Sequence, residues 1–229
     1  MKISYDLHLH SCLSPCGDND MTPNNIVNMA LLLGLDAIAV SDHNSSLNLP
    51  AVFKVAQNHG LTVVPAIEVC TNEEVHMLCL TYTLDDILAF SDELYQHLPN
   101  FKNDVDVFGQ QLIVDENDAI IGYENRLLIN ALDISIDQLL KIVRKYDGIV
   151  IPAHVDKTSN SVISNLGLIP SDYKFSCIEV KNPDFKVDFD GIRISNSDAH
   201  YLEHIHEPLN FINVTENSAH GIIDYLKNK

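Results

Sequence analysis

The chain is short of basic residues. Its 229 residues include 14 Lys and Arg against 32 Asp and Glu, which gives a formal net charge of −18. Such an acidic chain repels nucleic-acid backbones and anionic membranes unless cations intervene. We therefore expect neither a long nucleic acid nor a membrane among its partners. Bound divalent ions would offset part of the charge.

The sequence also lacks paired cysteines and long apolar runs. Its five cysteines show no Cys-x-x-Cys spacing, so we expect reduced thiols rather than a disulfide framework or a zinc ribbon. No stretch reaches the roughly 18 consecutive apolar residues of a membrane-spanning helix. The first residues, Lys2 to Asp6, contain no cleavable apolar segment, and these absences together predict a cytoplasmic protein.

Several common catalytic motifs are missing as well. The sequence has no Gly-x-Gly-x-x-Gly, no Gly-x-x-x-x-Gly-Lys-Ser/Thr and no Gly-x-Ser-x-Gly. These absences argue against nucleotide-dependent phosphoryl transfer and against serine hydrolysis. There is also no repeat or Gly/Ser linker, and 46% hydrophobic residues suffice for one core, so we predict a single domain over 1–229.

Short apolar strands alternate with amphipathic helices, which predicts an α/β fold with parallel strands and crossover helices. Thr22-Pro23 and Gly34 delimit a predicted helix. The predicted strands after it are residues 36–40, 61–67, 148–153 and 191–194. The stretch of about 84–130 departs from this pattern and reads as an elaboration near the site entrance: a helix over 85–98 and a hairpin of 112–114 with 119–121. Ser135 and Gln138 predict a capping box that opens a further helix.

Histidines and carboxylates follow the ends of these strands. The sequence has 11 histidines, and the segments that hold the candidate ligands are Asp6-Leu7-His8-Leu9-His10, Ser41-Asp42-His43, Glu68, His76, Ala153-His154 and Ser197-Asp198-Ala199-His200. Imidazoles and carboxylates are the ligands that zinc, manganese and iron require. Barrel enzymes assemble their sites from several strand ends, so we expect these side chains to converge on more than one divalent ion.

The first strand illustrates this expectation. Its alternation of side chains places Asp6, His8 and His10 on one face, so that the two histidines can bind one ion together. Asp6 can orient one of them by accepting an imidazole N–H. Asp42 is expected to orient a histidine or cap a loop.

The ordered set of these motifs, together with Asp18 and Thr22-Pro23, resembles the PHP (polymerase and histidinol phosphatase) family of metal-dependent phosphoesterases. The resemblance spans nearly the whole chain and implies a distorted, TIM-like (β/α)7 barrel that holds two to three divalent ions, which could be Mn, Zn or Fe. It implies His8, His10, Glu68 and Asp198 at the first ion, Glu68, His76 and His154 at the second, and Asp18, His43 and His200 at the third. Cys16 and Asp20 remain alternatives to Asp18, because Asn19 replaces the glycine that the family often carries there.

The resemblance further implies a phosphatase for a small phosphate monoester, such as a nucleotide or nucleoside bisphosphate, hydrolysed by metal-activated hydroxide. Glu68, Asp198, His43 and His200 are the predicted catalytic residues, and His43 or His200 could protonate the leaving group. Lys157 and Arg126 are the candidates for substrate contact. Three alternatives stay open: a histidinol-phosphate phosphatase, a short-oligonucleotide exonuclease and a non-catalytic metal-stabilised module. The sequence leaves the oligomeric state open.

Overall fold

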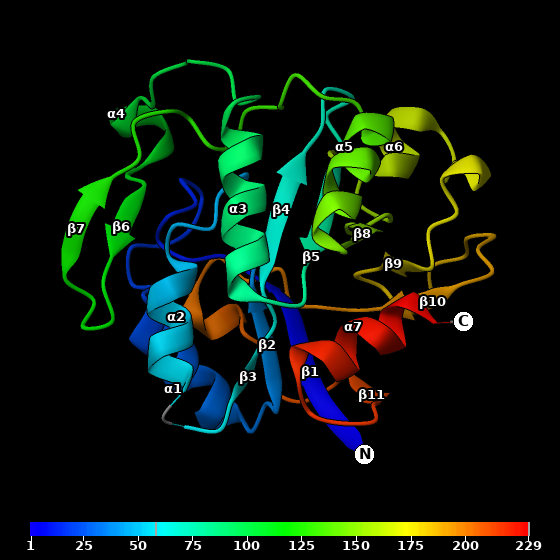
Figure 1. Cartoon of the computed structure of the whole chain (residues 1–229), viewed down its shortest axis with the longest axis horizontal. Coiled ribbons are helices and arrows are strands. Elements are labelled where there is room, and N and C mark those ends of the chain that lie inside the picture. The colour runs from blue at the N-terminus through cyan, green and yellow to red at the C-terminus, as the bar shows by residue number, and fades with distance from the viewer. Residues whose placement is uncertain (58, 229) are drawn as a thin grey trace.

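Strands and helices alternate along the chain in the computed structural model, which describes residues 1–57 and 59–228 (Figure 1). The strands are β1 (Lys2–Leu9), β2 (Ala37–Val40), β3 (Thr62–Val63), β4 (Ala66–Cys70), β5 (His76–Leu80), β6 (Leu112–Val114), β7 (Ile120–Tyr123), β8 (Ile149–Pro152), β9 (Cys177–Glu179), β10 (Ile192–Ile194) and β11 (Phe211–Asn213). The α-helices are α1 (Pro23–Leu33), α2 (Leu49–Ala56), α3 (Leu84–Tyr95), α4 (Val105–Phe108), α5 (Ile136–Val143), α6 (Val162–Leu166) and α7 (Ala219–Lys227). Short 3-10 helices span Arg144–Tyr146, Ser171–Tyr173 and Leu202–His204.

Local sequence signals set the helix ends where they were predicted. The Thr22 hydroxyl accepts a hydrogen bond from the Asn25 N–H and begins α1, and Gly34 ends it at a φ of 81°, a conformation that glycine adopts without a steric penalty. Ser135 and Gln138 form the predicted capping box of α5.

The hydrogen bonds divide the strands into four sheets, ordered β11-β1-β2-β3, β4-β5-β8, β10-β9 and β6-β7. Strand β1 lies inside its sheet, parallel to β2 and antiparallel to β11. Single backbone hydrogen bonds connect further strand ends: His10 N–H to Ala199 O at 3.0 Å, Asn44 N–H to Glu68 O at 2.9 Å and Val155 N–H to Glu179 O at 2.9 Å. The α/β class is confirmed, whereas the closed seven-stranded barrel stays a prediction.

Two details of the strands differ from the expected pattern. Strand β5 runs antiparallel to both β4 and β8, because only the turn of residues 71–75 links it to β4 and a parallel crossover needs a dozen or more residues. The stretch of 61–67 was predicted as one strand but contains the whole of β3 and the start of β4. Pro65, which has no N–H to donate, lies between them.

The apolar side chains form a core on both sides of the strands. One buried cluster joins the helices to the outer faces of the strands. A second cluster draws side chains from β1, β2, β4, β5, β8, β9, β10 and β11 together, and α7 closes it with Ile222, Ile223 and Leu226. Each such fully buried aliphatic side chain contributes about 1.5–3 kcal/mol to folding. This packing fixes the strand ends from which the candidate site is built.

The predicted elaboration is present as α3, α4 and the β6-β7 hairpin, with α3 against β4 and the hairpin at the side of the molecule (Figure 1). The Leu112 N–H donates to the Cys12 carbonyl at 2.8 Å, and the Val114 N–H donates to Asn48 Oδ1 at 3.0 Å. The hairpin is therefore fastened to the loop that follows β1. Within the described residues, the helices are all too short or too polar to cross a bilayer.

Candidate metal centre

Eight side chains from six strand ends meet at one buried point. They are His8 and His10 at the end of β1, His43 after β2, Glu68 in β4, His76 at the start of β5, His154 after β8, and Asp198 and His200 after β10. Their side chains are between 0% and 24% exposed, and His200 is the most accessible. The structure thus brings together the predicted ligands of all three ion sites except Asp18.

Glu68 lies at the middle of this cluster. Its Oε1 atom lies 3.3 Å from His8 Nε2, 3.0 Å from His76 Nδ1 and 3.1 Å from His154 Nε2, and its Oε2 atom lies 3.0 Å from His43 Nδ1 and 3.5 Å from His10 Nε2. Burial raises the pKa of a carboxyl, but here the imidazoles, led by His76, outweigh it and hold the pKa of Glu68 well below its usual range. The side chain is therefore an anion that faces five ring nitrogens.

Asp198 supplies the second carboxylate of the cluster. Its Oδ1 atom lies 3.4 Å from His8 Nε2 and 3.3 Å from His10 Nε2. The charge of His8 outweighs the effect of burial and lowers the pKa of Asp198. The residue adopts a left-handed backbone with a φ of 52°, which costs energy for a residue other than glycine. This backbone conformation directs the Asp198 carboxylate toward the rings of His8 and His10.

The donor set fits divalent cations. Three groups have ligand atoms within 4.8 Å of one another: His8 with His10 and Asp198, His43 with Glu68 and His76, and His10 with His43 and His200. The buried His43 Nδ1 and Glu68 Oε2 atoms lie 3.0 Å apart but lack the geometry of a hydrogen bond, so neither has a hydrogen-bond partner among the described residues. Unpaired buried polar atoms are costly, and a cation between them would satisfy both.

Glu179 is a member of the cluster that the sequence argument missed. It lies fully buried at the end of β9, with both carboxylate oxygens 3.1 Å from His8 Nδ1. It also accepts hydrogen bonds from the Asn196 side chain and the His154 backbone N–H, both at 2.7 Å. Because Nδ1 of His8 donates to this carboxylate, Nε2 is the nitrogen that faces Glu68 and Asp198, and once it has lost its proton it carries the lone pair that metal coordination requires. The apolar run before Glu179 was the available signal, since it too is a strand that ends in a carboxylate.

Asp42 positions His10 through a serine. It accepts hydrogen bonds from the Ser11 N–H at 2.7 Å and from the Ser14 hydroxyl at 2.7 Å. The Ser14 oxygen in turn lies 3.1 Å from His10 Nδ1, so this nitrogen donates and leaves Nε2 free for the cluster. Asp6 acts differently from the prediction, because its Oδ1 atom accepts from the backbone N–H groups of His8 and Ser197, not from an imidazole.

His200 lies at the rim of the cluster. Its ring stacks on His10 with centroids 4.2 Å apart, and its Nδ1 lies 2.9 Å from the Asp198 carbonyl oxygen. A carbonyl oxygen only accepts, so Nδ1 of His200 carries the proton and its Nε2 offers a lone pair. Nε2 is thus poised as a ligand rather than as a proton donor.

The loop of residues 14–20 places Asp18 beside the third group without joining it. The Asp18 N–H donates to the His200 carbonyl at 2.8 Å, but its carboxylate accepts from the Asp20 N–H at 2.8 Å. Asp20 is exposed. The side chain of Cys16 is exposed as well. Among the described residues, the three groups contain neither Asp18 nor its two alternatives.

The two predicted substrate-binding residues differ in their surroundings. The ammonium group of Lys157 is paired with Asp198 at the edge of the cluster, and its side chain is 40% exposed. The guanidinium of Arg126 instead donates to the Tyr95 and Leu98 carbonyls at 3.1 and 3.3 Å and lies 4.3 Å from the centre of the Tyr95 ring. Arg126 therefore anchors the end of α3 and is engaged away from the cluster.

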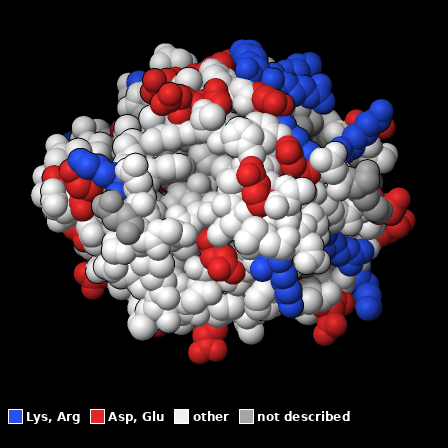
Figure 2. All heavy atoms as spheres, turned by 60° about the horizontal axis from the view of Figure 1, so that its bottom comes forward, with Lys and Arg blue, Asp and Glu red and all other residues white. Residues whose placement is uncertain are grey.

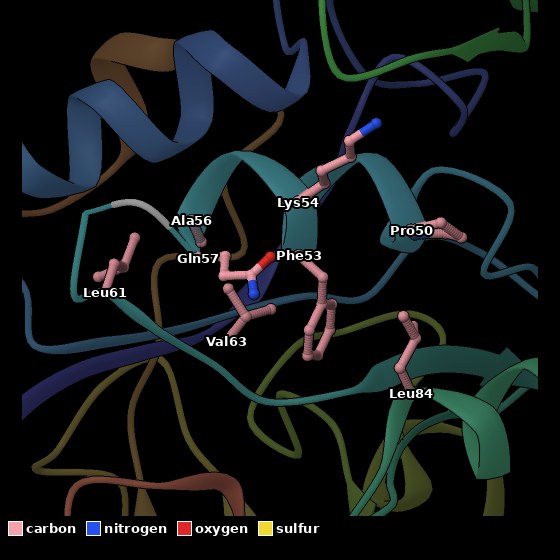
Figure 3. A pocket seen from close by; sticks show the side chains of 8 residues that line it. All are labelled: Pro50, Phe53, Lys54, Ala56, Gln57, Leu61, Val63 and Leu84. Atoms are coloured by element: carbon pink, nitrogen blue, oxygen red, sulfur yellow. The ribbon is translucent and has the colours of Figure 1, made fainter.

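A hollow of about 550 Å³ lies elsewhere, between α2, β3 and the start of α3 (Figure 3). Phe53 and Leu84 face it from opposite sides, and Lys54 points away from it (Figure 3). None of its lining residues belongs to the imidazole and carboxylate cluster. The volume of a hollow therefore does not identify the candidate metal site in this molecule.

Comparisons with known proteins agree with this geometry. A sequence model of the PHP domain matches residues 6–164. A 5′-3′ exoribonuclease of Salmonella typhimurium is 30% identical over 83 residues, which are 34% of this chain and 27% of that protein. The lesion-specific endonuclease EndoQ of Pyrococcus furiosus superposes with a TM-score of 0.75 at 19% identity, over 99% of this chain and 56% of that one. The structure of an Endonuclease Q complex with a 27-mer duplex superposes with a TM-score of 0.66 at 19% identity. The match covers 99% of this chain and 57% of that one. The chain thus spans little more than half, or less, of these proteins.

These comparisons overturn one expectation. The prediction that the chain takes no long nucleic acid as a partner is wrong, because a matching relative is an exoribonuclease and a solved neighbour is bound to a DNA duplex. The physical reason is that net charge sums over the whole surface. Contact with a phosphate depends on the charges within about one Debye length, roughly 8 Å in physiological salt.

Proposed function

The chain belongs to the PHP domain family, and we propose that it is a metal-dependent phosphoesterase. Its proposed substrate is nucleic acid, in which it hydrolyses phosphate ester bonds at the 5′ end of RNA. One observation carries the proposal: a single buried carboxylate, Glu68, faces five imidazoles from different strands. Among the described residues, the buried His43 Nδ1 and Glu68 Oε2 atoms have no hydrogen-bond partner, and a cation between them would remove that cost. The proposal includes the distorted seven-stranded barrel as the scaffold of this centre.

The residues of the cluster divide naturally between neighbouring ions. His8, His10, Glu68 and Asp198 would hold the first ion, and Glu68 would bridge to a second held by His76 and His154. His43 and His200 would hold a third, with Asp18 as the neighbouring carboxylate. When bound, such ions lower the pKa of water and neutralise charge on the phosphate oxygens.

The surrounding residues orient the ligands and exclude water. Glu179 and the Ser14–Asp42 pair fix the rings of His8 and His10, so that the lone pairs point inward before any substrate arrives. His200 is the most accessible of the ligands, so the substrate would enter on its side. A water molecule is the remaining proton source for the leaving group, because His43 would ligate the third ion and Nδ1 of His200 donates to a carbonyl.

Action at a chain end follows the likeness to the 5′-3′ exoribonuclease. Nonspecific binding along a strand uses a continuous basic groove with stacking aromatics. On the face in Figure 2, the basic side chains of the described residues instead stand in separate groups with acidic ones between them.

A phosphate monoester is the second candidate substrate, in the form of a nucleotide or nucleoside bisphosphate. The observation that favours it is the ammonium group of Lys157 beside Asp198, which can bind one phosphate group as a point charge. Both candidates use the same centre and differ only in the bond that is cleaved.

Product analysis tests the proposal. The protein loaded with Mn, Zn or Fe is incubated with a 5′-phosphorylated RNA, the 5′-hydroxyl RNA, the matching DNA, a nucleoside 3′,5′-bisphosphate and histidinol phosphate. We expect mononucleotides to appear from the 5′ end of the RNA. Release of inorganic phosphate alone would assign the monoester reaction, and no product from any substrate with any metal would refute a phosphoesterase.

The metal content gives an independent prediction. Because the ligand atoms form three groups, we expect two to three divalent ions per chain after reconstitution. Elemental analysis of protein purified without chelator measures this ratio. A ratio at or below one with every metal would contradict the multinuclear centre.

A further inference from the structure

We propose that Lys181 is a second phosphate-binding residue, which forms with Lys157 a two-ammonium subsite beside Asp198 for a phosphate group of the substrate. This inference rests on the proposed function and names the residues that grip the substrate. Lys181 lies two residues beyond Glu179, in the loop that follows β9. No motif in the sequence distinguishes it from other surface lysines.

The two lysines converge on one carboxylate. The ammonium group of Lys157 is hydrogen-bonded to Asp198 Oδ2, and that of Lys181 lies 3.9 Å from the same oxygen. Their side chains are 40% and 33% exposed, whereas the Asp198 side chain is 5% exposed. The carboxylate therefore faces the buried histidines on one side and two accessible cations on the other.

Asp156 holds the two loops together. Its Oδ1 atom accepts the Lys181 N–H at 2.9 Å and its Oδ2 atom accepts the Asn182 N–H at 2.8 Å. Because Asp156 directly precedes Lys157, the loops after β8 and β9 cannot separate without breaking these bonds. The ammonium of Lys181 also donates to the Ser197 carbonyl, next to Asp198. The lysine pair is thus held in place by the fold, which lowers the entropy lost on binding an anion.

The charge balance explains why a phosphate fits here. Two ammonium groups share the Asp198 carboxylate, while the Asp156 carboxylate is bound to backbone N–H groups, so the accessible edge of the site presents an excess of cations. If Asp198 ligates a divalent ion, its negative charge is shared with that ion and the excess grows. An anion at the rim then meets cations on both sides. Lysines act on phosphate as point charges, so two of them can approach different oxygens of one group.

Inorganic phosphate is the probe for this subsite. In the metal-loaded full chain, Lys181→Met should leave the metal content unchanged and weaken phosphate binding about tenfold, as expected for the loss of about 1.4 kcal/mol. Lys157→Met should do the same or more. Lys186→Met is the matched control, because it removes the same charge from an exposed position five residues along the chain and should change nothing.

Binding to a 5′-phosphorylated oligonucleotide gives a second readout. Loss of one phosphate contact should reduce the slope of log affinity against log salt by about one for Lys181→Met and leave it unchanged for Lys186→Met. In turnover, KM should rise more than kcat falls. Lys181→Arg keeps the charge and should retain phosphate binding. This variant still tests the inference if Lys181→Met folds poorly.

The outcomes separate the possible roles. If Lys181 only holds the Ser197–Asp198 loop, Lys181→Met will lose metal, and a lower metal content overturns the inference. Unchanged phosphate binding and an unchanged salt slope overturn it as well. Phosphate binding that weakens in this variant, in a protein that hydrolyses none of the tested substrates, would retain the subsite while refuting the proposed function.

Discussion

Glu68→Gln is expected to reduce phosphoester hydrolysis by more than about 10³-fold, equivalent to roughly 4 kcal/mol of barrier. The amide keeps the size of the side chain but removes the charge that faces five ring nitrogens. It also turns one ligand atom into an N–H donor, which cannot bind a cation. The variant should therefore hold fewer ions as well as lose activity.

Elemental analysis and kcat/KM of the same preparation measure both effects, and circular dichroism checks the fold. Glu207→Gln is the control, since this exposed glutamate undergoes the same chemical change and belongs to none of the three ligand groups. Activity within about tenfold of the unaltered protein would show that Glu68 does not bridge catalytic ions.

Glu179→Gln should lower metal affinity by about 10- to 100-fold without touching an ion directly. The carboxylate accepts from three donors: His8 Nδ1, the Asn196 side chain and the His154 N–H. An amide offers one oxygen and one NH₂ group, so at least one donor would face another donor. The resulting unpaired buried groups should also lower the free energy of unfolding by about 1–3 kcal/mol.

Titration of the metal-free variant with manganese or zinc, followed by calorimetry, measures the loss of affinity. Denaturant unfolding of the metal-free protein isolates the stability term. Glu203→Gln is the comparison at an exposed site. If affinity stays within twofold of the unaltered protein, then His8 is aligned by its own packing and Glu179 is not a positioning residue.

The sequence predicted those site residues that have a local signal, namely a position at or just after an apolar strand. His8 and His10 stand two residues apart on a strand, and His43 and His154 follow apolar strands directly, so their position at strand ends was visible. The convergence of these ends on Glu68 followed from the expected fold. A local pattern cannot show which distant residue faces a given ring, and for this reason the pairing of His8 with Glu179 was missed.

Other differences have the same origin. Strand β5 departs from the expected parallel pattern, because its direction depends on the length of the preceding turn and on its neighbours β4 and β8. Arg126 was chosen for its rarity and its place in the elaboration. Its guanidinium instead donates hydrogen bonds to two carbonyls at the end of α3, and these contacts form only on folding.

The order of the ligands along the chain has a consequence for biosynthesis. The cluster needs His8 near one end and His200 near the other, and β1 pairs with β11, which follows residue 210. During synthesis β1 meets its partner β2 early, whereas its other partner, β11, is made about 200 residues later. Contacts of such long sequence separation form slowly, and incomplete chains expose apolar surface meanwhile. The complete ligand set therefore exists only after the ribosome has passed His200.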